Sequence, residues 1–365
     1  MNGYLQKDGK KKIAGCVLLA AGFVLLSISR ISHEFADWYS EHIYVLLVGS
    51  LGRIAGIAPF SVAEMLLYVL VISVIIGAVA RRKQWLWGFF LLACLLFFLY
   101  AANCGINYNR ESFSEMADIP LEEYSAEELE AVCLWLTEEV NGLSVQIKRD
   151  ENGVARLDGE KRSDKERLGG ETEMKVAGSA AEAMQRLGDE YEGLAGDYPR
   201  PKGLKVPWIL SVQQLSGVYS PFTIEANYNT AMVDYYIPFT MCHELSHLRG
   251  FMQEEEANFI AFLACYGSEE EEFRYSGALV GWTYCMNVLY RADYERWEIV
   301  REQLSPLVEA DLAANRDFWS SYDGAVAEVS NKVNDTYLKA NGQSDGVKSY
   351  NRMVDLIVSH YAKRG

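Results

Sequence analysis

The residues of this chain best suited to chemistry are His243, Glu244 and His247, which form the pattern His-Glu-x-x-His within the stretch 239–249. On a helix, positions i and i+4 lie on one face, so two imidazoles at this spacing can share one tetrahedral ion. Glu244 stands beside them, where its carboxylate can take a proton from a zinc-bound water. The pattern therefore predicts a Zn²⁺ site with Glu244 as general base, and peptide hydrolysis is the usual use of such a site.

An opposite interpretation is a partly exposed helix that carries two incidental histidines. The chain has only five His, however, and two of them fall in this register. Cys242 lies next to His243, but one residue along a helix turns by about 100° and points it away from the site. We therefore expect Cys242 to lie in the core and not to bind metal.

The helix that carries this pattern has clear boundaries. Pro238 suits the first turn of a helix, and Gly250 suits the left-handed residue just past its end. Three carboxylates, 254–256, then precede an apolar helix over 257–266. Acidic residues favour a helix start through the macrodipole alone. Zinc nevertheless needs a third protein ligand, and the Gly250 turn can bring these carboxylates back toward the histidines.

The first hundred residues contain three apolar runs, each about long enough to cross a hydrocarbon core: 13–29, 65–80 and 85–102. A fourth run, 43–60, contains Arg53, and a central Arg costs about 2.5–3.5 kcal/mol in a span. We expect 43–60 to lie at the interface. The predicted division is a membrane anchor over 1–102 and an outer domain over 103–365, with a signal peptide over 13–29 as the alternative for the first run.

The distribution of basic residues predicts the orientation in the membrane. A lysine cluster at 7–12 precedes the first span, and the basic loop 81–83 joins the last two. Both patches should be cytoplasmic. The N-terminus is then cytoplasmic, the protein crosses the cell membrane several times, and the region after residue 103 is extracytoplasmic.

The outer region is acidic, and the chain as a whole has a net charge of −16. This charge argues against nucleic acid as a partner and against tight binding to an anionic membrane surface. The apolar spans imply membrane lipid around the anchor, and the His-Glu-x-x-His pattern implies a peptide or protein substrate of unknown identity. The cysteines show no CxxC spacing and no disulfide framework.

Periodicity and turn signals predict a mainly helical outer domain with a few strands. Helices are expected near 126–141, 177–194, 275–290, 294–303, 307–332 and 350–363, strands over 206–212 and 218–228, a surface insertion over 145–170, and a turn region over 333–350. The first helix begins with a capping box at Ser125 and Glu128. The segment 217–229 is well placed either to pair with an extended substrate beside the metal helix or to form a plain structural hairpin.

Several strings of this sequence resemble a bacterial family catalogued as domain of unknown function 3810. They are the strings at 217–227, 238–251, 254–259, 275–277 and 337–342, with Asn107-Tyr108 after the third span. The resemblance covers nearly the whole chain. It implies a three-span anchor followed by an outer His-Glu-x-x-His domain, and it supplies no substrate.

The string Glu254-x-x-Ala-Asn258 is also similar to the helix that supplies the third ligand in several Glu-zincin metallopeptidases. That match implies Glu254 as the third zinc ligand and Asn258, one turn on, as a partner that orients the ligands. Glu254 lies only seven positions after His247, so Glu256 stays an alternative ligand. A phenol that stabilises the oxyanion could come from several tyrosines: Tyr219, Tyr228, Tyr275 or Tyr350.

Together these patterns predict a membrane-anchored α+β protein with three N-terminal transmembrane helices and a mainly helical zincin-like domain that contains a small β-sheet. The favoured hypothesis is a zinc metallopeptidase with ligands His243, His247 and Glu254. A second hypothesis is a membrane-bound sensor or binding protein in which the zinc site is structural or inactive. A transport function is disfavoured, because the spans carry little charge beyond Arg53.

Overall fold

The computed structural model describes residues 2–80, 83–119, 121, 123–157, 170–341 and 352–364. The described chain is mostly helical with one small sheet of three strands. It divides into two compact units. The first contains residues 1–111 and 220–225, and the second contains 112–219 and 226–365. The mainly helical character, the small sheet and the three apolar N-terminal helices were all predicted from the sequence.

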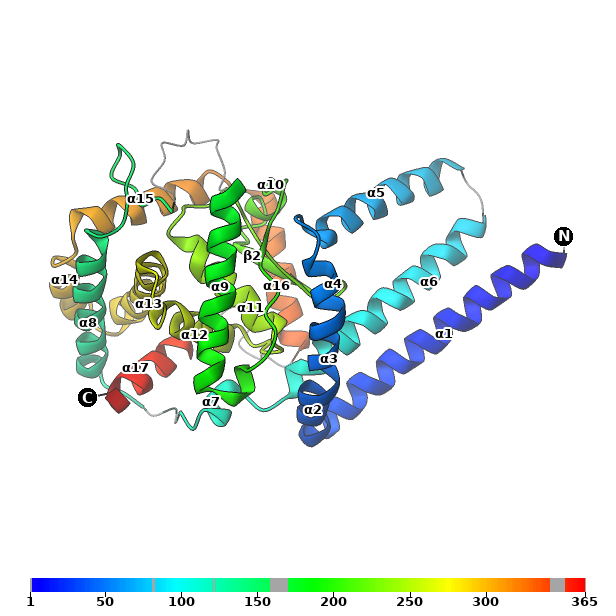
Figure 1. Ribbon diagram of the computed structural model, residues 1–365, viewed down its shortest axis with the longest axis horizontal. Coiled ribbons are helices and arrows are strands. Elements are labelled where there is room, and N and C mark those ends of the chain that lie inside the picture. Colours follow the sequence, from blue (N-terminus) through cyan, green and yellow to red (C-terminus); the bar gives the residue numbers. More distant parts are fainter. Residues whose placement is uncertain are drawn as a thin grey trace. The chain divides into compact units, whose positions relative to one another are not determined.

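The first unit contains three helices long and apolar enough to cross a membrane, drawn in blue to cyan in Figure 1. They are α1 (Asn2–Ile31), α5 (Val62–Ala80) and α6 (Lys83–Tyr100), and the apolar stretch of the last continues to Asn109. The segment 43–60 is not among these candidate spans. Short helical pieces follow one another over residues 33–56 and cover most of this segment: α2 (His33–Tyr39), η1 (Ser40–Tyr44), α3 (Val45–Leu47), η2 (Val48–Gly52) and α4 (Arg53–Gly56).

Helix α1 packs along α6 through residues that lack side chains. A Cβ at Gly15 would lie 2.6 Å from the ring of Phe90, and one at Gly22 would lie 2.8 Å from the ring of Phe97. Small residues at such contacts let helices approach closely where no hydrophobic force drives them together.

The segment Ser220–Glu225 belongs to the first unit although it lies far along the chain. The buried carboxylate of Glu225 accepts hydrogen bonds from the backbone N–H groups of Val62 (3.1 Å) and Ala63 (2.8 Å). These are unpaired donors of the first turn of α5, so Glu225 caps that helix from a distant part of the sequence.

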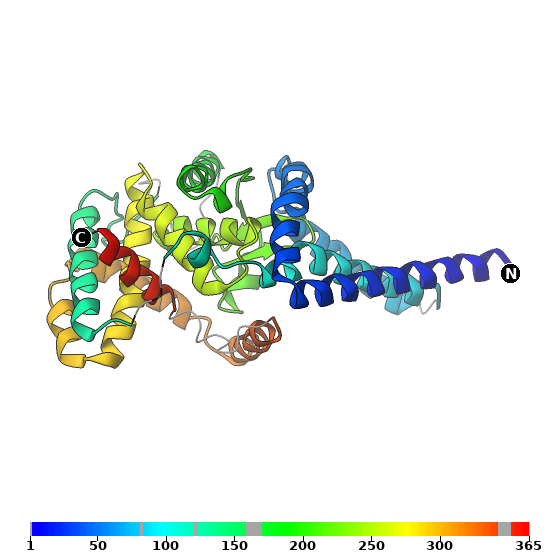
Figure 2. The same ribbon diagram turned by 90° about the horizontal axis from the view of Figure 1, so that it is seen from below.

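The second unit is built around α12 (Glu254–Tyr266), which is apolar nearly all round and almost fully buried. It packs against α9 (Gly170–Glu190), α11 (Tyr236–Leu248), α13 (Glu271–Ala292) and α17 (Arg352–Arg364). Both views show α17 beside this central group (Figures 1 and 2). The remaining helices are α7 (Phe113–Met116), α8 (Ala126–Ser144), η5 (Glu192–Leu194), α10 (Trp208–Ser211), α14 (Tyr294–Arg301), α15 (Pro306–Ser320) and α16 (Ala325–Ala340).

The small sheet has the strand order β1-β3-β2, with β1 (Lys202–Gly203), β2 (Gly217–Ser220) and β3 (Glu225–Tyr228). Strand β1 pairs with β3 in parallel, with Lys202 opposite Asn227. Strands β2 and β3 are neighbours joined by four residues, so they form an antiparallel hairpin. Strand β2 is therefore an edge strand of the sheet.

Several predicted boundaries are confirmed and others are wrong. The Ser125–Glu128 capping box is present at the start of α8. The predicted strand 206–212 is helix α10, because Pro207 starts a helical turn that the Ser211 hydroxyl closes by donating to the Pro207 carbonyl. The predicted hairpin segment 218–228 turns at 221–224.

The predicted helix 307–332 is two helices, α15 and α16, that are separated at 321–324. Residues 333–340, predicted as turns, continue α16. The predictions for 158–169 and 342–351 lie outside the described residues.

Candidate metal centre

Helix α11 carries the His-Glu-x-x-His pattern and ends in a turn that shapes the site. The N–H of Phe251 donates to the carbonyl of Ser246 (3.1 Å), and the N–H of Gly250 donates to that of His247 (2.9 Å). This pair of bonds is a Schellman motif, which needs a left-handed residue, and Gly250 has φ +100°. The chain therefore turns back sharply after the second histidine, as Gly250 predicted.

This turn also orients His247. The carbonyl oxygen of Phe251 lies 2.8 Å from Nδ1 of the imidazole. Because a carbonyl can only accept, Nδ1 must carry the proton, and Nε2 then presents a lone pair. Burial lowers the pKa of His247 to about 4, so the ring is neutral at pH 7. A neutral imidazole with a fixed tautomer is ready to bind a metal ion.

Helix α12 begins at Glu254, directly after the turn, and its carboxylate faces both histidines. Its two oxygens lie 3.4 Å from Nε2 of His243 and 3.6 Å from Nε2 of His247. The ligand atoms of the three residues all lie within 4.8 Å of one another.

These distances test whether the donor set fits zinc. Ligand atoms about 2.0–2.2 Å from an ion, at tetrahedral angles, are roughly 3.4 Å apart. The two measured separations are close to that value, and both exceed the usual range of an N–H···O hydrogen bond, about 2.7–3.2 Å. Two imidazoles and one carboxylate are also the ligand types that zinc prefers. The residues present therefore fit a zinc ion.

Solvent reaches the three side chains only in part. They are 12% (His243), 10% (His247) and 16% (Glu254) exposed. Burial works to lower the pKa of His243, but the carboxylates of Glu254 and Glu244 outweigh it and raise that pKa above its ordinary value. The carboxylate of Glu254 thus places negative charge beside two imidazoles, an environment that favours a bound cation.

The carboxylate of Glu244 lies against the edge strand β2. Glu244 is 3% exposed, and the backbone N–H of Tyr219, in β2, hydrogen-bonds its carboxylate. Its second oxygen, Oε2, has no hydrogen-bond partner in the described part of the chain. Burial, with Glu254 adding to it, raises the pKa of Glu244 to about 8, although His243 acts against this. A buried carboxylate oxygen without a partner is costly, which suggests that it serves a bound group.

Residue 217 must be small for this arrangement to exist. A Cβ on Gly217 would lie 2.4 Å from Oε1 of Glu244 and 2.8 Å from the carbonyl oxygen of Asn227. Any side chain there would push Glu244 or the strand away. Glycine at 217 thus lets the edge strand β2 come against the catalytic candidate.

The chain was compared with protein families, curated proteins and solved structures. The model of the family described as "Protein of unknown function (DUF3810)" matches residues 39–358, which is most of the chain and includes all residues of the candidate metal centre. The chain belongs to this family. No curated protein matched, and no solved structure matched.

Glu255 and Glu256, the two carboxylates next to Glu254 in this DUF3810 chain, lie outside the cluster that contains the histidines. Among the described residues, the group that could hold a metal contains Glu254 and neither Glu255 nor Glu256. Glu255 is buried and pairs with Arg352 at 3.6 Å. The structure therefore brings Glu254 to the histidines, and Glu256, the alternative ligand, lies outside the cluster.

Two further residues considered in the sequence analysis, Asn258 and Cys242, are both buried. Asn258, one turn after Glu254, is buried and contributes to raising the pKa of His243, although its Nδ2 has no hydrogen-bond partner in the part of the chain described. Cys242 is fully buried and lies beside Cys265, as expected of a core residue.

Of the four candidate phenols, two are engaged elsewhere. Tyr228 hydrogen-bonds Glu173 (3.3 Å), and Tyr275 donates to Asp311. Tyr350 lies outside the described residues. Tyr219 touches the centre through its backbone. No pattern in the sequence predicts this backbone contact. The Phe251 carbonyl, by contrast, follows from the Gly250 turn.

Proposed function

We propose that this protein is a membrane-anchored zinc metallopeptidase in which His243, His247 and Glu254 hold the ion and Glu244 is the general base. The observation that carries this proposal is the buried, unpartnered Oε2 of Glu244 beside a cluster of two histidines and one glutamate. Three protein ligands are the usual number in catalytic zinc sites, where a fourth position is kept for water or substrate.

The chemistry divides between the ion and the protein. Zinc held by His243, His247 and Glu254 would supply an activated water at neutral pH and would polarise the substrate carbonyl. The charge of that ion would lower the pKa of Glu244 from about 8, so that its carboxylate could accept the proton of the attacking water on Oε2 and pass it to the leaving amine. Tyr219 holds the other side of the carboxylate through its N–H, so the orientation of Oε2 is fixed before substrate binds.

Strand β2 supplies a binding surface for an extended peptide. A strand added to a sheet edge gains affinity from backbone hydrogen bonds without regard to its sequence. Because the N–H of Tyr219 already bonds Glu244, a peptide would pair with other backbone groups at the edge of β2. Because Gly217 lies directly against Glu244, a peptide paired with β2 passes next to the general base.

The three apolar helices support membrane lipid as the surroundings of the first unit. The clusters of basic residues support a cytoplasmic N-terminus, with the metal centre on the outer side of the cell membrane. The substrate class proposed is a peptide or protein that is present on that side.

One observation favours a second candidate, a sensor or binding protein with a structural zinc site. The three ligand side chains are only 10–16% exposed, and structural zinc sites are closed. In a structural zinc site, however, the unpartnered Oε2 of Glu244 would have no function.

The test is peptide cleavage by the purified full-length protein, wild type against Glu244→Gln, with zinc content measured for both. Glutamine keeps the shape of the side chain but cannot accept the proton, so we expect cleavage to fall about 10²–10⁴-fold at unchanged zinc content. Glu255→Gln, at a neighbouring carboxylate outside the cluster, is the matched control and should cleave normally.

Equal cleavage by wild type and Glu244→Gln would remove Glu244 as the base. Full zinc occupancy without cleavage of any peptide would favour the sensor.

A further inference from the structure

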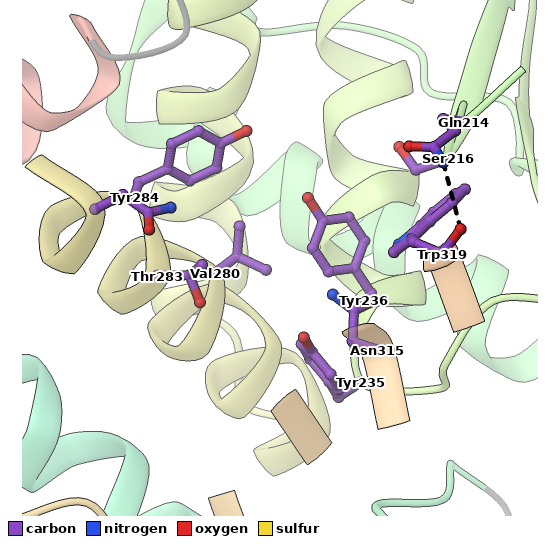
Figure 3. Close-up of a pocket in the computed structure, with 10 residues that line it drawn as sticks. Gln214, Ser216, Tyr235, Tyr236, Val280, Thr283, Tyr284, Asn315 and Trp319 are labelled. Carbon is purple, nitrogen blue, oxygen red and sulfur yellow. Dashed lines mark hydrogen bonds between the residues drawn. The ribbon is translucent and has the colours of Figure 1, made fainter. Parts of the chain in front are cut away.

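A second candidate site in the second unit is a pocket of about 390 Å³, shown in Figure 3. Its walls come from the segment before β2 and from α11, α13 and α15. The lining residues are Gln214, Ser216, Tyr235, Tyr236, Val280, Thr283, Tyr284, Asn287, Asn315 and Trp319. The volume falls in the range of small-molecule sites, about 300–1,000 Å³, and is enough for one large side chain.

The lining determines the chemistry of a ligand. Four of its residues are aromatic and three are carboxamides, and none carries a charge at pH 7. A charged ligand group would lose hydration there without gaining a counter-charge. Aromatic walls favour a flat apolar group. The pocket therefore suits a neutral, planar group.

The carboxamides add a more specific requirement. Gln214 is fixed, because its Nε2 donates to Asp323 (2.7 Å) and to the carbonyl of Trp319 (3.3 Å), which holds the Trp319 wall in place. The Oδ1 of Asn315, in contrast, is buried and has no hydrogen-bond partner among the described residues. A buried acceptor without a donor is unfavourable, and a ligand that brings an O–H or N–H donor would satisfy it.

Two segments that line the pocket lead along the chain to residues of the candidate metal centre. Tyr236 precedes His243 by seven positions on α11, which is two turns, so both lie on one face about 10 Å apart along the axis. Ser216 directly precedes Gly217, which lies against Glu244. An extended peptide advances about 3.3–3.6 Å per residue, so the pocket lies about three residues from the base.

We propose that this pocket binds a tyrosine or tryptophan side chain of the peptide substrate, with its O–H or N–H donated to Asn315. This inference rests on the proposed peptidase function. Antiparallel pairing is the more stable arrangement, and it makes the peptide run from the Ser220 end of β2 toward the Gly217 end. The aromatic residue then lies about three positions to the C-terminal side of the cleaved bond.

The experiment uses the full-length protein in detergent and a fluorogenic peptide library that varies each position in turn. We expect kcat/KM to be at least about 10-fold higher for Tyr or Trp than for Phe at that position, because Phe leaves Asn315 unpaired. Asn315→Leu should abolish this preference. Arg316→Leu, on the same helix but 74% exposed, is the control and should keep it. Thr283→Phe fills the pocket and should reduce cleavage of both aromatic peptides.

A binding measurement separates failure of this inference from failure of the proposed function. Labelled peptides with Tyr or Phe are titrated against Glu244→Gln protein, with and without Asn315→Leu. Tighter binding of the Tyr peptide, lost in Asn315→Leu, supports the pocket even if the wild type cleaves nothing. Glu244-dependent cleavage without an aromatic preference, or equal binding of the two peptides, would overturn the pocket and leave the peptidase proposal intact.

Discussion

Two buried polar clusters of the second unit differ in how completely their hydrogen bonds are satisfied. In the first, Asp311 is fully buried and every oxygen of its carboxylate is used. Oδ1 accepts from the N–H of Ala155 (2.7 Å), and Oδ2 accepts from Arg149 (3.0 Å) and from the hydroxyl of Tyr275. Arg149 also donates to the backbone carbonyls of Ser144, Gly153 and Leu307.

The second cluster, the candidate metal centre, is also largely buried, but its hydrogen bonds are incomplete. Oε2 of Glu244 and Nδ1 of His243 have no partner among the described residues. The carboxylate of Glu254 lies 3.4 Å from Nε2 of His243 and 3.6 Å from Nε2 of His247, separations that fit two ligands of one ion. Both clusters bear the cost of burying charge, and only the first recovers it from protein groups. We infer that the Asp311 cluster serves the fold and that the metal centre is completed by a ligand.

The largest effect is predicted for a substitution that breaks the Asp311 cluster, whose hydrogen bonds are satisfied. Asp311→Ala leaves the buried guanidinium of Arg149 without its carboxylate, and we expect a loss of about 3–5 kcal/mol in the free energy of unfolding. Urea titration of the full chain, followed by tryptophan fluorescence, measures it. Zinc affinity of the folded protein should not change.

Asp317→Ala, on the same helix with a side chain 76% exposed, is the control and should stay within about 0.5 kcal/mol of wild type. If both variants lose the same small amount, the satisfied cluster does not stabilise the fold.

An intermediate effect is expected at Gly250, which has φ +100° and sets the turn after α11. Gly250→Ala places a Cβ in the left-handed region, which costs about 1–2 kcal/mol. It should also shift the Phe251 carbonyl from His247 and weaken zinc binding about 10–100-fold, the usual effect of losing a group that orients a ligand. Competition with a fluorescent chelator measures the affinity.

Gly142→Ala is the matched control, because a Cβ at Gly142 would meet nothing within 4 Å. It should leave zinc affinity unchanged and add up to about 1 kcal/mol of helix stability. Normal zinc affinity in Gly250→Ala would show that the Phe251 carbonyl does not orient His247.

The smallest predicted effect concerns the capping box of α8, whose hydrogen bonds are satisfied but exposed to solvent. Ser125→Ala removes the capping box of α8 and should cost about 1 kcal/mol, without changing zinc content. Hydrogen bonds from Ser125 lower the pKa of Glu128 in the folded protein. The stabilisation that Glu128 contributes is therefore fully present above the ordinary pKa of Glu, and it is lost as the pH falls through the lowered pKa of Glu128. Unfolding measured at neutral and acid pH should show a smaller difference between the proteins in acid. A difference that does not shrink would contradict the role of Glu128.

Local signals predicted much of the fold and part of the site. The apolar runs identified the three long helices, and Pro238 and Gly250 marked the ends of the helix that carries the histidines. The prediction failed where short segments carried few residues, as at Trp208–Ser211. The contacts of Tyr219 with Glu244 and of Asn315 with the pocket depend on packing between distant segments, which one sequence does not reveal.

The most direct test of the metal centre is the zinc content of the purified full-length protein and of its carboxylate variants. We predict one zinc ion per chain in the wild type, near-complete loss in Glu254→Ala and in His247→Ala, and full retention in Glu255→Gln, whose carboxylate pairs with Arg352. A wild type that binds no zinc would contradict the assignment of this cluster as a metal centre. Retention by Glu254→Ala together with loss by Glu256→Ala would contradict Glu254 as the third ligand.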